Sequence, residues 1–77
     1  MLELILGTNM DRQTLPVSYD ATIRSVLEAA NIDFSTGSLH LNGVILRPGD
    51  IDKTFNELNV TGSKASLISV VKGDGGR

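Results

Sequence analysis

The spacing of the apolar residues changes twice along this chain, and this limits its fold more than any other feature. In residues 1–7, and again in residues 12–19, apolar side chains occupy alternate positions, as they do in a half-buried β-strand. The polar residues 8–11 between the two runs favour a turn, so the pair predicts a β-hairpin. Pro16 has no backbone N–H to donate, and we therefore expect the second run to be an edge strand.

After residue 20 the apolar spacing becomes that of a helix. Apolar residues then stand at i, i+3, i+4 and i+7, at Ile23, Val26, Leu27 and Ala30. This pattern predicts an amphipathic helix with one buried stripe. Either Asp20 or Thr22 can cap its first turn. Asn31 can end it, because asparagine tolerates the left-handed conformation.

Alternating spacing returns in the second half of the chain. Residues 38–41 and 44–46 are short apolar runs separated by Asn42 and Gly43. Asn-Gly is the strongest short hairpin signal, because a type I′ turn needs positive φ at both of its central residues. The pattern predicts a second hairpin here.

The rest of the chain predicts three short elements. Residues 47–50 suit a tight turn, and residues 51–60 suit a short helical turn that buries Phe55 and Leu58. Residues 65–71 are rich in β-branched side chains and predict the last strand.

In order, the expected elements are hairpin, helix, hairpin, short helical turn and strand. A right-handed crossover through the helix makes the first and last strands parallel neighbours. We therefore expect an α+β domain in which one main helix covers one face of a mixed four- to five-stranded sheet. The 77 residues leave room for one domain. We place it at residues 1–72 and expect a flexible, glycine-rich tail at residues 73–77.

Composition excludes several classes of function. The chain has no cysteine, which removes disulfides, zinc–thiolate sites and thiol nucleophiles. Its net charge is −2 and its seven Lys and Arg residues are scattered, so we expect no binding to nucleic acid. No apolar stretch is long enough to span a membrane, and Glu3 stands where a signal peptide carries positive charge. We expect a cytoplasmic protein that is a monomer.

The sequence offers no set of residues for catalysis. Its single histidine and scattered carboxylates form no evident acid–base pair. Residues 73–76 are not a phosphate loop, because no strand-to-helix context surrounds them. Asp50 and Asp52 supply too few oxygen ligands for a calcium loop. We predict that the protein is not an enzyme and uses no metal or cofactor.

The order and spacing of these elements resemble the ubiquitin-like, or β-grasp, superfamily. The likeness is most specific in residues 39–46, 52–60 and 66–71, followed by the diglycine Gly75-Gly76. Chains of that superfamily typically show there an apolar strand with a glycine turn, a turn with an acid–Thr–apolar motif, and a final strand. The resemblance implies a β-grasp fold, but that fold serves many purposes.

The resemblance also implies chemistry at the tail. In ubiquitin-like modifiers, and in the sulfur carriers of thiamin and molybdopterin synthesis, an E1-like activating enzyme adenylates the terminal glycine carboxylate. A thioester or thiocarboxylate then forms. By this likeness Gly76 carries the reacting carbonyl, Gly75 allows close approach, and Gly73 is the hinge of the tail. Arg77 follows the diglycine, so a processing protease has to remove it first.

Asp74 occupies a tail position at which ubiquitin has arginine. We therefore expect a dedicated activating enzyme rather than that of ubiquitin. The alternative for the whole tail is a chain end that is merely frayed.

Strand alternation also defines a candidate binding face. If Leu39, Leu41 and Leu67 point at the helix, the residues between them point away from it. The open face then carries His40, Ile68 and Val70. Ubiquitin's main interaction patch has the same residue types on these strands, with the isoleucine and histidine exchanged. In the opposite register, Ile68 and Val70 would belong to the core.

Two functions follow from these features. The leading hypothesis is a modifier or sulfur carrier that acts through Gly76. The alternative is a non-conjugated adaptor that binds proteins through the face around His40, Ile68 and Val70.

Overall fold

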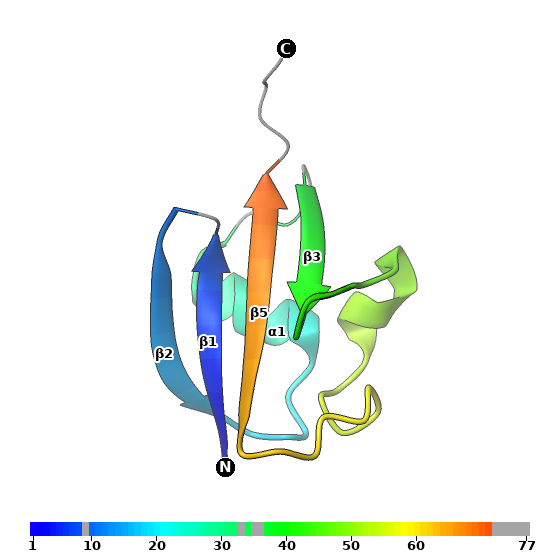
Figure 1. Ribbon diagram of the computed structural model, residues 1–77. Coiled ribbons are helices and arrows are strands. Elements are labelled where there is room, and N and C mark those ends of the chain that lie inside the picture. Colours follow the sequence, from blue (N-terminus) through cyan, green and yellow to red (C-terminus); the bar gives the residue numbers. More distant parts are fainter. Residues whose placement is uncertain (9, 33, 35–36, 72–77) are drawn as a thin grey trace.

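The computed structural model describes residues 1–8, 10–32, 34 and 37–71 (Figure 1). These residues form a five-stranded mixed sheet with the strand order β2-β1-β5-β3-β4. The strands are β1 (Leu2–Thr8), β2 (Arg12–Val17), β3 (Gly37–Leu41), β4 (Val44–Ile45) and β5 (Lys64–Val71). The helices are α1 (Ile23–Ala29) and the 3₁₀-helix η1 (Pro48–Asp52). The expected α+β class is confirmed.

The pairing of the strands agrees with the expected crossover. β1 runs antiparallel to β2 and parallel to β5, and β5 runs antiparallel to β3. In Figure 1, α1 lies behind the sheet and leaves the other face bare. Pro16 lies in β2, which is an edge strand of the sheet. It is exposed and pairs with Glu3 of β1. The edge position removes the need for the N–H that proline lacks.

The ends of α1 are set by two local signals. Thr22 rather than Asp20 is the N-cap, and its hydroxyl accepts a hydrogen bond of 3.1 Å from the backbone N–H of Ser25. At the other end, Asn31 has φ 62° and closes the helix as expected. The N–H of Ile32 then donates to the carbonyl of Leu27 at 2.9 Å, which satisfies one of the last free carbonyls.

The core lies between α1 and the inner face of the sheet. Its buried apolar residues are Leu2, Leu4, Leu6, Val17, Ile23, Val26, Leu27, Leu39, Leu41, Phe55, Val60, Ala65 and Leu67. Alternate residues of the strands and the predicted stripe of α1 thus meet in one cluster. Burying a leucine or isoleucine side chain fully is worth roughly 1.5–3 kcal/mol, so this cluster supplies the main driving force for folding.

The helical segment after the second hairpin differs from the prediction. A helix begins at Pro48 and ends at Asp52, where a tight turn was expected over residues 47–50. Proline sets φ for the first helical position, and the Asp50 carboxylate accepts a hydrogen bond of 3.1 Å from the N–H of Arg47. The helix therefore starts earlier than apolar spacing indicated.

Residues 55–59 form a hydrogen-bonded turn instead of the expected helical turn over residues 51–60. Thr54 and Glu57 cap each other, since each side chain accepts a hydrogen bond from the other's backbone N–H, at 3.0 and 2.8 Å. Phe55 is fully buried as predicted, whereas Leu58 is only half-buried.

Two remaining sequence predictions concern the tail and membrane-spanning segments. The tail at residues 73–77, with Gly73, Gly75, Gly76 and Arg77, lies outside the described residues. Within the described residues, no helix has the length and apolar character needed to cross a membrane.

Candidate functional site

The sheet face opposite α1, here called the outer face, holds one continuous row of residues. Strand register aligns one residue from each of the five strands across the sheet. This outer row is Arg12, Gly7, Ile68, His40 and Ile45, from β2 to β4. From β2 to β4, the row consists of a cation, a glycine, an isoleucine, a histidine and a second isoleucine.

The three predicted face residues lie together on this side of the sheet. His40 and Ile68 are directly opposed in the antiparallel pair of β3 and β5, and Val70 lies two residues further along β5. Their neighbours Leu39 and Leu67 are buried in the core. Strand alternation therefore places Ile68 and Val70 on the outer face, apart from the cluster between α1 and the sheet.

Ile68 is more covered than the sequence implied. It lies on the outer face yet is only 8% exposed, whereas His40 and Val70 are half-buried. On the inner face the small polar side chain of Ser69 is fully buried. Ile68 therefore forms a floor of the outer face, and the more exposed residues around it would make first contact with a partner.

Three exposed apolar residues in or near the outer row were not predicted from the sequence. Ile45 is 63% exposed and pairs with His40, and Ile5 is 38% exposed on β1. Met10, in the turn between β1 and β2, is 85% exposed. The alternation that places Leu4 and Leu6 inward already places Ile5 outward, so that signal was available. No local pattern identifies Met10.

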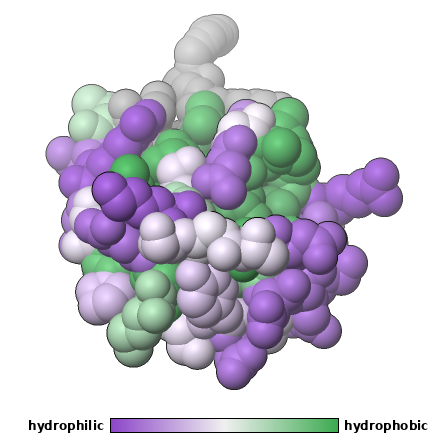
Figure 2. Space-filling view, turned by 60° about the horizontal axis from the view of Figure 1, so that its bottom comes forward, coloured by the Kyte–Doolittle hydropathy of each residue, from purple (hydrophilic) through white to green (hydrophobic). Residues whose placement is uncertain are grey.

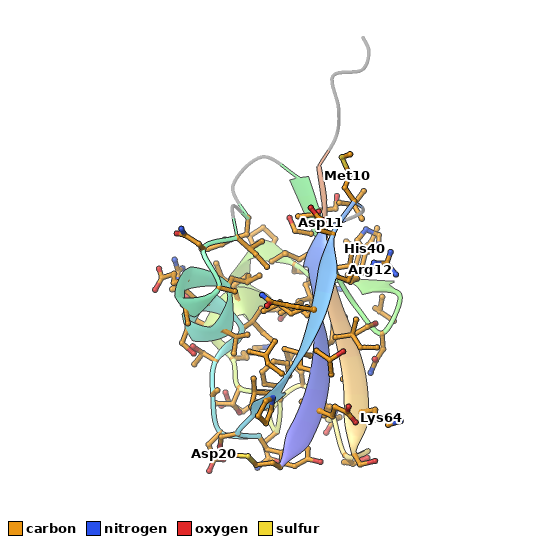
Figure 3. All side chains as sticks on the ribbon, turned by 90° about the vertical axis from the view of Figure 1, so that its left-hand side faces the viewer. Met10, Asp11, Arg12, Asp20, His40 and Lys64 are labelled. Atoms are coloured by element: carbon orange, nitrogen blue, oxygen red, sulfur yellow. The ribbon has the colours of Figure 1, made fainter. Side chains whose placement is uncertain are left out.

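Cationic side chains accompany this apolar surface. Figure 3 shows Met10, Arg12, His40 and Lys64 on the side of the sheet away from α1. Among the described residues, the ion pairs join α1 to η1 and Asp50 to Lys53, and neither involves Arg12 or Lys64. The Nε of Arg12 instead donates a hydrogen bond of 3.5 Å to the Thr8 carbonyl, and Glu3 is the register partner of Lys64.

The outer face carries both apolar and hydrophilic side chains. Figure 2, in which this face is turned toward the top of the view, shows hydrophobic area gathered at the upper right among hydrophilic side chains. Recognition surfaces commonly combine an apolar centre with a polar rim. The arrangement therefore suits contact with another protein.

At Gly7, the second residue of the outer row, neighbouring backbone atoms leave no room for a side chain. A Cβ there would lie 2.0 Å from the carbonyl oxygen of Asp11 and 2.7 Å from the Cα of Arg12. The turn after β1 therefore closes tightly onto Gly7, and the outer row has no side chain between Arg12 and Ile68.

The titratable side chains of the described residues are dispersed. In the described part of the chain, no three His, Asp or Glu side chains gather where they could hold a metal ion. Two pockets of about 450 and 390 Å³ beside β4 share Ile45, Leu46 and Arg47 in their linings. Their linings bring no pair of titratable groups to the outer row.

The other predicted site is the tail, which lies outside the described residues. The structure describes the strand that leads to it, since β5 ends at Val71 between β1 and β3. In comparisons with known proteins, the chain matches no family model, no curated protein and no solved structure.

Proposed function

We propose that this chain is a β-grasp domain of the ubiquitin-like type that binds other proteins through its outer face. A parallel pair of β1 and β5 at the centre of the sheet, one crossover helix and a bare opposite face support the fold assignment. Partner binding is the function that the geometry supports best. We further propose a cytoplasmic monomer.

The outer row is the observation that carries this proposal. An apolar floor at Ile68, a half-buried imidazole at His40 and a protruding Ile45 lie side by side on three strands. Aliphatic and cationic groups that adjoin in this way can be covered together by one partner, which removes apolar area from water and pairs Arg12 with an acid.

The short strand β4 provides a matched pair of variants to test the proposal. Val44 and Ile45 are neighbours with nearly equal exposure, 66% and 63%, but Val44 pairs with Leu41 and Ile45 pairs with His40. Only Ile45 belongs to the outer row. Ile45→Asp should abolish capture of partners from the native cells, and Val44→Asp should leave capture intact.

Both variants should remain folded, because neither side chain belongs to the core. Circular dichroism before the capture experiment checks this point. Ile68→Asp is a weaker test, since burying a carboxylate at an 8% exposed site would itself destabilise the sheet. Equal capture by the two folded β4 variants, whether both retain or both lose partners, would contradict the outer face as the binding site.

A second candidate function is conjugation or sulfur transfer through Gly76. The diglycine that follows shortly after β5 favours it, together with the β-grasp arrangement proposed above. This function requires a protease that removes Arg77 and an E1-like enzyme that activates Gly76. Gly75 would allow the carbonyl to be approached closely, with Gly73 as the hinge.

Mass spectrometry of the protein from its native cells tests this second function. A mature chain that ends at Gly76, is joined to lysines or carries a thiocarboxylate would support it. An intact, unmodified Arg77 in every molecule would contradict it. Deleting residues 75–77 separates the two functions, because it should remove conjugates and leave capture through Ile45 unchanged.

Neighbouring genes discriminate between the two forms of tail chemistry. Genes for an activating enzyme and a deubiquitinase-like protease would favour a modifier. Genes for thiamin or molybdopterin synthesis would favour a sulfur carrier.

A further inference from the structure

The turn between β3 and β4 contains an asparagine in a chemically labile position. Asn42 is followed by Gly43, and both residues are exposed. Apart from the two adjoining residues, no atom lies within 4 Å of the place that a Cβ on Gly43 would occupy. Because glycine has no side chain, the backbone nitrogen after Asn42 is open to the attack geometry that other residues obstruct.

Two other asparagines provide an internal comparison. Asn31 and Asn59 have φ of 62° and 64°, close to the 52° of Asn42, and both are exposed. They are followed by Ile32 and Val60, whose β-branched side chains crowd the next backbone nitrogen. The three sites therefore share backbone conformation and differ in the residue that follows.

The fold restrains the Asn42 side chain through β5. Its Oδ1 accepts a hydrogen bond of 2.9 Å from the N–H of Ser66, and its own N–H donates to the Ser66 carbonyl at 2.8 Å. The side chain is thereby held toward β5. Its Cγ can approach the Gly43 nitrogen only after the bond to Ser66 has opened.

Opening of this hairpin should cost little. β4 has two residues, and both of its side chains, Val44 and Ile45, are mostly exposed. Segments with few buried apolar contacts are the first to open locally in a folded protein.

We propose that Asn42 is a deamidation site whose rate is set by opening of the β3–β4 turn away from Ser66 of β5. The Gly43 backbone nitrogen gives up its proton to hydroxide and bonds to Cγ of Asn42. The bond from Cγ to the side-chain nitrogen breaks, and that nitrogen takes one proton from water and leaves as ammonia, which regenerates hydroxide. The cyclic imide takes up one water and opens at either carbonyl, which yields aspartate or isoaspartate. The reaction is a substitution followed by hydrolysis and involves no change of oxidation state.

The two products have different structural effects. Aspartate keeps an oxygen for the N–H of Ser66 and adds one negative charge beside the outer face. Isoaspartate adds a methylene to the main chain, which shifts the pairing of β4 and displaces Ile45 from its place opposite His40. Deamidation would therefore alter one end of the outer row.

Peptide mapping of the full-length protein after incubation in mildly alkaline buffer tests this proposal. Exchange of the side-chain NH₂ for OH should appear at Asn42 and not at Asn31 or Asn59. The reaction should be roughly 5- to 30-fold slower in the folded chain than in urea, the factor expected when one or two ordinary hydrogen bonds must open first.

Two variants separate the cyclisation step from the opening of the turn that precedes it. Ile45→Gly loosens β4 beside the turn and should raise the folded rate toward the rate in urea. Gly43→Ala also loosens the turn but crowds the attacking nitrogen, and should suppress the reaction. The proposal is overturned if Asn42 stays unmodified, if Asn31 or Asn59 reacts as fast, or if the rates in the folded chain and in urea are equal.

Discussion

The turn that closes the first hairpin depends on the absence of a side chain at Gly7, and Gly7→Ala tests this directly. An added Cβ would lie 2.0 Å from the Asp11 carbonyl oxygen and 2.7 Å from the Cα of Arg12. Both contacts are with backbone, so no side-chain rotation can relieve them. The turn has to move by about 1 Å to restore ordinary van der Waals separation.

That movement breaks specific interactions. The N–H of Thr8 donates to the Asp11 carbonyl at 2.8 Å, and the Thr8 hydroxyl accepts from the N–H groups of Met10 and Asp11 at 3.1 and 3.2 Å. Losing one or two such bonds, together with residual backbone strain, predicts a destabilisation of about 2–4 kcal/mol. For a domain of this size that lowers the melting temperature by roughly 10–25 °C.

Two other glycines serve as controls. Apart from the adjoining backbone, no atom lies within 4 Å of a Cβ on Gly49, so Gly49→Ala should be neutral or stabilise by up to about 1 kcal/mol. Gly43 is equally open but has φ +84°, so Gly43→Ala should cost roughly 1–2 kcal/mol. Urea unfolding followed by far-ultraviolet circular dichroism measures all three variants. Equal midpoints for Gly7→Ala and Gly49→Ala would refute the steric argument.

Three further perturbations test individual contacts. Tyr19→Phe removes the 2.6 Å hydrogen bond from the phenol to the Gly62 carbonyl and should cost about 0.5–1.5 kcal/mol in urea unfolding; an unchanged midpoint would contradict this. Asn59 has φ 64°, so Asn59→Gly should be near neutral while Asn59→Ala costs about 1 kcal/mol, and reversal of that order would count against the left-handed assignment. The hydrogen bond from Arg24 to Asp52, with their charge attraction, lowers the pKa of Asp52. This pair therefore stabilises the fold above the ordinary carboxylate range, and its contribution is lost as pH falls through the lowered pKa. In an NMR titration Arg24→Ala should raise the pKa of Asp52 toward its ordinary value, and no change would contradict the pairing.

The elements with local causes could be predicted from sequence. The stripe of α1, its end at Asn31 and the turn at Asn42-Gly43 each follow from residues that are close together in the chain. The segment after β4 could not be predicted so well. The apolar spacing around Phe55 is compatible with a capped turn as well as with a helix. The position of η1 follows from Pro48 and the Asp50 side chain.

The sequence predicted which side of the sheet carries the candidate site, but not how exposed the residues of that site are. Alternation in β3 and β5 placed His40, Ile68 and Val70 on one side of the sheet, and the structure agrees. The small exposed fraction of Ile68 was not predictable, because it depends on strands that are distant in the sequence. The same holds for the position of Ile45 beside His40, which requires the register of β4.

Outside the segment after β4, the sequence by itself determined which segments become strand, helix and turn, and which strand residues share a face, because these properties depend on side-chain periodicity and on the allowed φ of a few residues. Only the tertiary structure decided which strands are neighbours and in what register. The outer row exists because β1 joins β2 to β5, and this places Arg12, Gly7 and Ile68 in one line. Such alignments arise from packing between remote segments, where one common core must satisfy every strand at once.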